Sequence, residues 1–197
     1  MKKLSFTIAG LAFLVAAASS LVHGQSATPS SEAPRYVKGS NLVRPPDYRD
    51  WAFVSSGLGM DYNPAPGQER APVFQNVFVN PSSYREFMKT GKWPDKTTFV
   101  LEFRASTSEG SINKGGRFQS QLVGLEAEVK DSRFPDGWAF FNFGRGNALQ
   151  DSAEPQPDDA GCRECHTKNT AVERTFVQFY PTLLDVARKM KTVKPGF

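Results

Sequence analysis

A regular alternation of large apolar side chains in the middle of the chain limits its possible folds more than any other feature. Residues 97–104 place Phe99, Leu101 and Phe103 on one face of an extended strand. Period-two alternation rich in aromatic and β-branched residues is typical of β-strands. Strands are also predicted at 51–54, 73–79, 118–130 and 137–143. Strands come first and helices mostly last, which predicts an α+β domain with an antiparallel sheet of about five strands, packed with helices.

Helices are predicted in two parts of the chain. Asn80-Pro81 can open a short helix, because asparagine caps helix starts and proline suits the first helical position. Gly91 can end that helix in a left-handed conformation. In the C-terminal third, apolar residues recur at helical spacing over 172–179, and Pro181 starts a further helix.

The first 24 residues have the pattern of a secretory signal peptide. Two lysines precede an almost purely apolar run over 8–22, and Val22-His23-Gly24 offers small residues at the cleavage positions. A membrane anchor is the alternative, but the run is short for a full span. We therefore expect a signal peptide at 1–24, a flexible linker at 25–35 and one folded domain at 36–197. The mature protein would be periplasmic or secreted, without membrane contact.

Cleavage would change the charge and the histidine count. It removes two of the 24 basic residues and none of the 20 acidic ones, which leaves a net charge of +2. So small and scattered a surplus of positive charge gives little support for nucleic-acid binding. Cleavage also removes His23, one of two histidines, and leaves His166 alone in the mature chain.

The sequence Cys162-Arg163-Glu164-Cys165-His166 has the Cys-x-x-Cys-His spacing of c-type haem attachment. Two thiols three positions apart on a helical turn can reach the two vinyl groups at one porphyrin edge. The adjacent histidine then places its imidazole under the iron. We expect one covalent haem c, carried by the C-terminal helices, with His166 as the iron ligand.

Three other interpretations compete for this motif. A redox pair of cysteines would need a thioredoxin-like βαβ setting, but the motif follows a long loop late in the chain. A structural zinc site needs four ligands, and the mature chain has only three cysteines and histidines. An exported disulfide is a further alternative, although it leaves the adjacent histidine unexplained.

The sequence also bears on the second axial position of the iron. Low-spin electron carriers usually have a second histidine or a methionine there. Met88 and Met190 lie on apolar helix stripes, so Met60, in a Gly-rich segment, is the best methionine candidate. Without such a ligand the iron is five-coordinate and open to small gases. The chain has 16 phenylalanines, most of them expected in the core. We expect the haem to contact Phe99, Leu101, Phe103 and Phe118.

Several segments together resemble one family. They are Tyr48-Arg49-Asp50-Trp51, Val77-Phe78-Val79-Asn80-Pro81, Thr90-Gly91-Lys92-Trp93-Pro94-Asp95, Gly124-Leu125-Glu126, Val129-Lys130-Asp131, Gly137-Trp138-Ala139-Phe140, the haem motif and Thr175-Phe176-Val177-Gln178-Phe179-Tyr180-Pro181-Thr182-Leu183. In this order the set resembles the cytochrome P-460 and cytochrome c′-beta family over roughly residues 46–185. The resemblance implies a mostly antiparallel β fold, a homodimer and one five-coordinate c-type haem.

The family has two chemical branches, and two positions bear on the choice between them. Cytochrome P-460 oxidises hydroxylamine and has a lysine bonded to the haem, whereas cytochrome c′-beta lacks that lysine and binds NO and CO. Leu101 stands where the resemblance places the lysine. Nearby lysines lie on the preceding helix end and turn, at Lys89, Lys92 and Lys96. Glu126 matches the family's distal carboxylate and is either a proton relay or the partner of a surface cation.

These observations predict a protein that binds NO or CO at a five-coordinate haem. A hydroxylamine-oxidising enzyme with a lysine–haem cross-link is the first alternative. A periplasmic electron carrier with Met60 as sixth ligand is the second. The expected partners are small gaseous or nitrogen-oxide ligands and a periplasmic redox partner.

Overall fold

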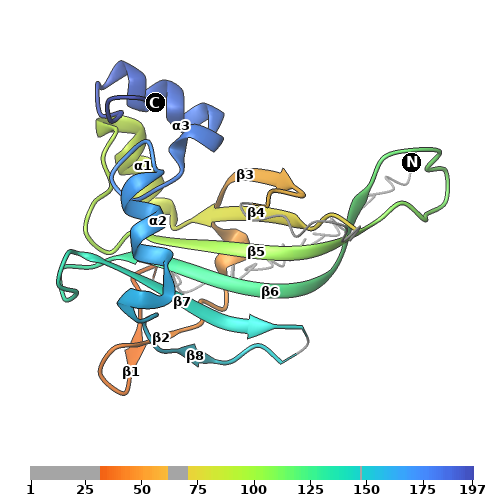
Figure 1. Ribbon diagram of the computed structural model, residues 1–197, viewed down its shortest axis with the longest axis horizontal. Helices are drawn as coiled ribbons and strands as arrows, with labels where there is room; N and C mark the ends of the chain where they lie inside the picture. Colours follow the sequence, from red (N-terminus) through yellow and green to blue (C-terminus); the bar gives the residue numbers. More distant parts are fainter. Residues whose placement is uncertain (1–31, 62–70, 147) are drawn as a thin grey trace, which may run out of the picture.

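The computed structural model describes residues 32–61, 71–146 and 148–197. The predicted signal peptide and most of the predicted linker therefore lie outside the described residues. Within these ranges, the main sheet has five antiparallel strands in the spatial order β3-β4-β5-β6-β7 (Figure 1). Their bounds are β3 (Ala52–Leu58), β4 (Phe74–Val79), β5 (Thr98–Thr107), β6 (Phe118–Lys130) and β7 (Trp138–Arg145). All five coincide with predicted strands, and the predicted α+β class is confirmed.

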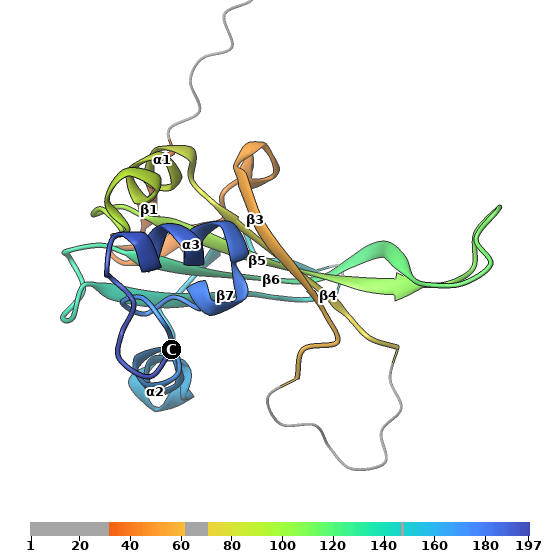
Figure 2. The same cartoon turned by 90° about the horizontal axis from the view of Figure 1, so that it is seen from above.

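A smaller sheet lies against the other side of the main sheet from α2 (Cys162–Lys168), as Figure 2 shows. It pairs its strands in the order β1-β2-β8. Their bounds are β1 (Tyr36–Val37), β2 (Asn41–Val43) and β8 (Ser152–Ala153). A 3₁₀ helix, η1 (Tyr48–Asp50), leads from this sheet into β3. The loop predicted over 144–161 therefore contains a strand, and also a second 3₁₀ helix, η2 (Asp158–Ala160).

Helix α1 (Pro81–Thr90) begins and ends where the sequence predicts, but its cap differs. Gly91 follows it with a φ of 67°, a left-handed conformation that glycine adopts without strain. The Asn80 side chain does not cap the helix; its Oδ1 accepts a hydrogen bond of 2.8 Å from the Thr98 N–H in β5. The free N–H of Ser82 instead donates to the carboxylate of Glu32 at 2.7 Å. A residue of the predicted linker thus supplies the cap.

The prediction of a helix over 172–179 is wrong. The chain makes a tight turn there, with Glu173 at a φ of 49° and an isolated bridge between Val172 and Thr175. The hydroxyl of Thr175 donates to the Val172 carbonyl at 2.8 Å and accepts from the Trp93 indole at 2.9 Å. These side-chain bonds hold a turn in place of helical backbone bonds. The 3₁₀ helix η3 (Val177–Phe179) and α3 (Pro181–Lys189) follow.

Two apolar cores stabilise the main sheet. One joins its helical side to α1 and α3 and includes Phe87, Trp93 and Leu183. The other joins the opposite side to the small sheet and includes Leu42 and Phe143. Burying each such side chain contributes roughly 1.5–3 kcal/mol. Seven of the 16 phenylalanines pack in these two cores, fewer than the sequence suggested. Among the described residues, no helix has the length and apolar character needed to span a bilayer.

Candidate functional site

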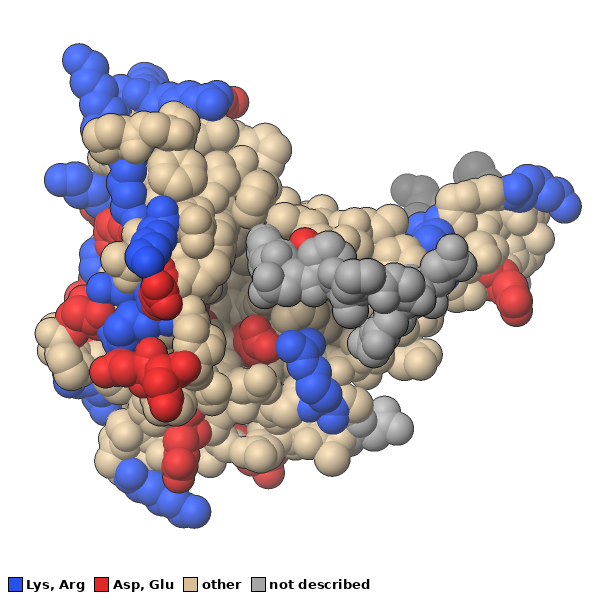
Figure 3. All heavy atoms as spheres, in the orientation of Figure 1, with Lys and Arg blue, Asp and Glu red and all other residues tan. Residues whose placement is uncertain are grey.

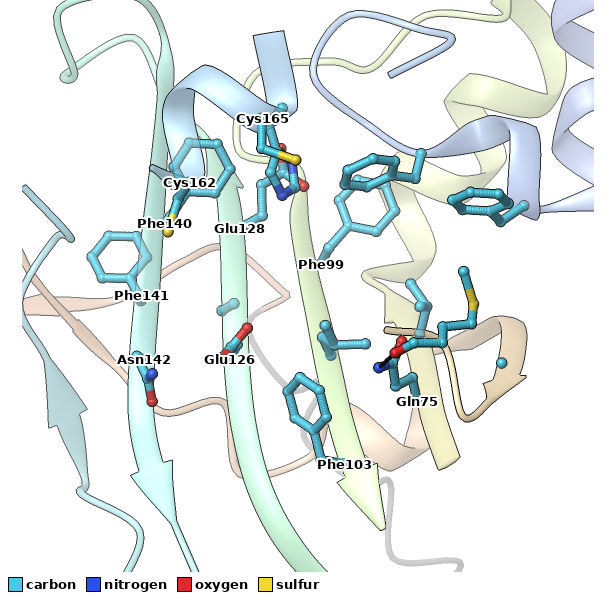
Figure 4. A pocket seen from close by; sticks show the side chains of 18 of the residues that line it. Gln75, Phe99, Phe103, Glu126, Glu128, Phe140, Phe141, Asn142, Cys162 and Cys165 are labelled. Atoms are coloured by element: carbon cyan, nitrogen blue, oxygen red, sulfur yellow. Dashed lines mark hydrogen bonds and ion pairs between the residues drawn. The ribbon is translucent and has the colours of Figure 1, made fainter. Parts of the chain in front are cut away.

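A cavity of about 500 Å³ lies between α2 and the face of the main sheet (Figure 4). Figure 3 shows this face of the molecule hollowed beside α2. The strand register brings the side chains of the cavity floor together in three rows that cross the strands. The rows are Phe99, Glu128 and Phe140; Val77, Leu101, Glu126 and Asn142; and Gln75, Phe103 and Arg145. Strands far apart in the sequence thus contribute to one surface.

Helix α2 presents Cys162, Cys165 and His166 to this cavity. Gly161 starts the helix at a φ of 79°, which lets the chain turn sharply into it. Both cysteines are free thiols and only partly buried. Burial raises the pKa of the Cys162 thiol, and the negative charge of Glu126 raises it further. The three residues of the motif therefore face the same apolar space, from one turn of helix.

Charged side chains of both signs gather over α2 (Figure 3) and fix it to neighbouring segments. The guanidinium of Arg163 binds Asp136, at the start of β7, and also Asp158, at 2.7 Å. Arg174 binds the same Asp136 carboxylate at 2.6 Å. Burial opposes ionisation of Asp136, but its bonds to the two arginines outweigh this and lower its pKa. These contacts set the position of the helix relative to the sheet.

The imidazole of His166 is held on three sides. Its Nδ1 lies 2.8 Å from the carbonyl oxygen of Arg174, and its ring centroid lies 4.5 Å from that of Phe140 and 4.7 Å from that of Phe176. A histidine that donates from Nδ1 to a carbonyl keeps the lone pair of Nε2 for a metal. Burial lowers the pKa of His166, but the nearby Glu128 carboxylate outweighs this and raises it.

Three of the four predicted haem-contacting residues line the cavity, namely Phe99, Leu101 and Phe103 on β5. Phe118 does not line it. It pairs with Thr107 near the far end of the β5–β6 hairpin, which projects from the body of the molecule in Figure 1, and its side chain is exposed. The hairpin extends beyond the predicted end of β5, and this carries Phe118 away from the site.

Glu126 lines the cavity and is also half of an ion pair. Its carboxylate accepts a bond of 2.7 Å from Arg145, whose guanidinium carbon lies 4.0 Å from the centre of the Phe103 ring. Gly124 makes room for this arrangement, since a Cβ there would lie only 2.8 Å from Cδ of Arg145. Burial raises the pKa of Glu126, and Arg145 and then His166 partly oppose the shift. Both sequence hypotheses for Glu126, a site carboxylate and a partner of a cation, are thus compatible with its position.

The lysines near the predicted cross-link position do not line the cavity. Lys96 binds the buried Asp131 at 2.5 Å, and Lys89 lies 3.7 Å from Glu86 on the exposed side of α1. Lys92 is exposed beyond the end of that helix. Their side chains therefore belong to the surface.

Met60 and Met88 lie as the sequence suggests, whereas the placement of Met190 on an apolar helix stripe is wrong. Met60 lines the cavity, where its sulfur packs against Gly57. Met88 packs against the core between the sheet and α1, and Met190 is partly exposed after α3. Met60 is the one methionine of the described residues that lines the site.

Several cavity residues were missed from the sequence. Glu128 lies two positions after Glu126 on the same strand face, so the alternation of β6 could have identified it. Arg145 and Tyr180 gave no local signal, because only the strand register and the turn after α2 bring them to the site. Phe176 and Phe179 were assigned to a helix stripe, whereas both line the cavity from the turn and η3.

These residues fit a haem. The cavity volume is in the range of sites for large organic ligands, and its walls are mostly apolar with a few polar groups. The thiols and the free nitrogen of His166 reach it from one helix, as the c-type motif requires. Among the described residues, no three cysteine, histidine or carboxylate side chains gather as a metal site, which gives the zinc alternative no support.

An apolar cavity that receives two thiols and an imidazole from one helical turn defines a haem protein of the cytochrome class. The model of the family described as Cytochrome P460 matches residues 45–177. The chain belongs to the cytochrome P460 family, and haem is the cofactor that this membership implies. A search of curated proteins found no match.

Proposed function

We propose that the protein carries one haem, bound covalently through thioethers to Cys162 and Cys165. His166 would hold the iron through Nε2, while the Arg174 carbonyl fixes the imidazole through Nδ1 at 2.8 Å. The haem supplies an iron centre that can bind small molecules or exchange one electron. The chain's own contribution is to orient the histidine and to surround the haem with mostly apolar side chains.

The function that the geometry supports best is binding of NO or CO at a five-coordinate haem. The observation that carries this proposal is the wall formed by Val77, Leu101 and Phe103, which is apolar and without lysine. His166 is also the only histidine among the described residues. Neutral diatomic molecules can lie against these three apolar side chains without the desolvation cost of a charged ligand, although the polar Gln75, Glu126 and Arg145 line the same cavity.

Optical spectra of the purified protein test this proposal. We expect high-spin, five-coordinate spectra in both the ferric and the ferrous protein, and a spectral shift on addition of NO or CO to the ferrous form. Low-spin bands in the unliganded protein would contradict it, because they require a second strong axial ligand.

Hydroxylamine oxidation is the second candidate, and the pair of Glu126 and Arg145 favours it. A partly buried carboxylate with a raised pKa can accept protons from a substrate at the iron. Turnover of hydroxylamine with an artificial electron acceptor would support this function. Loss of that turnover in Glu126→Gln, with the haem spectrum preserved, would assign the proton transfer to Glu126.

Electron transfer with Met60 as the sixth ligand is the third candidate, favoured by the position of Met60 on the cavity wall. It predicts a low-spin ferric spectrum with a methionine–iron charge-transfer band. A high-spin spectrum would remove it.

We further propose that the protein is exported to the periplasm or secreted, acts there as a homodimer and exchanges electrons with a redox partner. The signal-peptide pattern at 1–24 supports export, and c-type attachment in bacteria takes place outside the cytoplasm. Mass measurement of the mature N-terminus and of the assembly in solution tests these points.

A further inference from the structure

The carboxylate of Glu128 lies against the proximal histidine. It points from β6 into the space below α2 (Figure 4), and its side chain is 12 % exposed. Its Oε1 lies 3.3 Å from Nδ1 of His166. The N–H direction of Nδ1 favours the carbonyl of Arg174, at 2.8 Å, so that within the described chain Oε1 is buried without a hydrogen-bond partner.

Such a position needs an explanation, because burying a carboxylate oxygen without a partner is costly. Cations of the neighbouring segments are committed elsewhere. The Arg174 guanidinium binds Asp136 and the hydroxyl of Thr167, and Lys130 binds Glu173. The Nδ1–H of His166 is therefore the donor within reach of Glu128.

We propose that Glu128 is a positioning residue of the haem site, whose carboxylate shares the Nδ1–H of His166 with the carbonyl of Arg174. This inference rests on the proposed function, in which His166 binds the iron. A carboxylate at this position fixes the tautomer and ring rotation of a metal-bound histidine and makes the histidine a stronger electron donor. The iron–histidine bond becomes stronger, and the ferric state is stabilised relative to the ferrous state.

Glu128→Gln tests the proposal, because glutamine keeps the size of the side chain and replaces the carboxylate by a weaker, neutral acceptor. In the ferrous holoprotein we expect the iron–histidine stretching frequency, measured by resonance Raman, to fall. We also expect a higher reduction potential. The expected rise in potential is about 59 mV. For a one-electron couple this is a tenfold larger ratio of reduced to oxidised protein at a fixed potential.

Glu126→Gln is the matched control. It removes a carboxylate from the same face of the same strand, and Glu126 is bound to Arg145 instead of lying against His166. Both variants can raise the reduction potential through the loss of negative charge. Only Glu128→Gln should change the iron–histidine frequency.

The outcomes separate this inference from the proposed function. A wild-type ferrous protein without an iron–histidine band would overturn the five-coordinate site itself. A wild-type band that Glu128→Gln leaves unchanged would overturn the role of Glu128 alone. Glu128→Asp retracts the carboxylate by one methylene and should lower the frequency in the same direction. Loss of holoprotein in both variants would also count against the proposal, because it indicates a purely structural role.

Discussion

Leu101 lies directly opposite Glu126 in the register between β5 and β6, and both side chains line the haem cavity. An apolar side chain and a carboxylate with a raised pKa thus face the same space from neighbouring strands. Leu101 also occupies the position where the hydroxylamine-oxidising branch is expected to carry its lysine. The choice between gas binding and hydroxylamine oxidation therefore depends on this pair of positions.

Digestion of the wild-type protein should give a haem peptide that contains the segment 162–166 and no second segment. The reason is that no lysine of the described chain lines the cavity. Mass spectrometry of the haem peptide checks this, with Leu101→Lys as the comparison. A wild-type mass that includes a bridge to Lys89, Lys92 or Lys96 would contradict the gas-binding proposal.

The reduction potential should fall as pH rises through the ionisation of Glu126. Burial raises the pKa of this carboxyl above 4.5, so it stays neutral in acid and gains its charge at higher pH. A nearby negative charge stabilises ferric iron. Glu126→Gln should remove this part of the pH dependence of the reduction potential. The difference between the two potential–pH curves, measured by spectroelectrochemistry, should have its midpoint above 4.5, and a midpoint below that value would refute the assignment.

Gly124→Ala should break the pair between Arg145 and Glu126. The new Cβ would lie 2.8 Å from Cδ of Arg145, so the arginine must move away from the strand. Because Arg145 lowers the pKa of Glu126, its departure should move the pH midpoint further upward. The arginine is half-exposed, so we expect little loss of stability. Arg145→Gln should reproduce the upward shift of the pH midpoint without any steric clash. If the two variants shift the midpoint in opposite directions, the ion pair between Arg145 and Glu126 does not cause the shift.

Met60→Ala should leave the ferric and ferrous spectra of the unliganded protein unchanged. Met60 lines the cavity, but its sulfur packs against Gly57. This contact is expected of a side chain that forms the cavity wall and does not bind the iron. Faster CO binding is expected because the smaller side chain opens that wall. Conversion of a low-spin spectrum to a high-spin one would instead identify Met60 as the sixth ligand.

Glu102→Ala should destabilise the protein by about 1–3 kcal/mol, the cost of leaving a buried hydrogen-bond donor such as the Tyr48 hydroxyl without its acceptor. Glu102 is buried on the opposite face of β5 from the cavity. It binds Arg49, Tyr48 at 2.5 Å and Arg104 at 2.7 Å, so it joins η1 to the sheet. Chemical denaturation of the holoprotein measures the effect. The exposed Glu109 gives the control Glu109→Ala, for which we expect a change within about 0.5 kcal/mol.

The sequence was most informative where structure depends on neighbouring residues. The alternation of β5 placed Phe99, Leu101 and Phe103 on one face, because the orientation of strand side chains has a period of two. It could not place Arg145 beside Glu126, since that contact depends on the register between β6 and β7. Phe118 was misplaced because the length of the hairpin was underestimated.

The C-terminal segment shows a different limit of local pattern. Its apolar residues recur at helical spacing, yet Thr175 uses its hydroxyl to close a turn with Val172 and to bind the Trp93 indole. Tertiary contacts therefore override the periodicity. The same turn brings Phe176 against His166, so the error over this segment also hid part of the site.

No residue of α2 is fully buried, and the ion pairs of Arg163 with Asp136 and Asp158 tie the helix to neighbouring segments. The apolar cores on both faces of the sheet are built from other segments, with α2 contributing nothing to them. The two thiols therefore lie on a segment at the rim of the molecule, outside both cores. In the proposed holoprotein, the haem would therefore join this peripheral turn to the centre of the molecule.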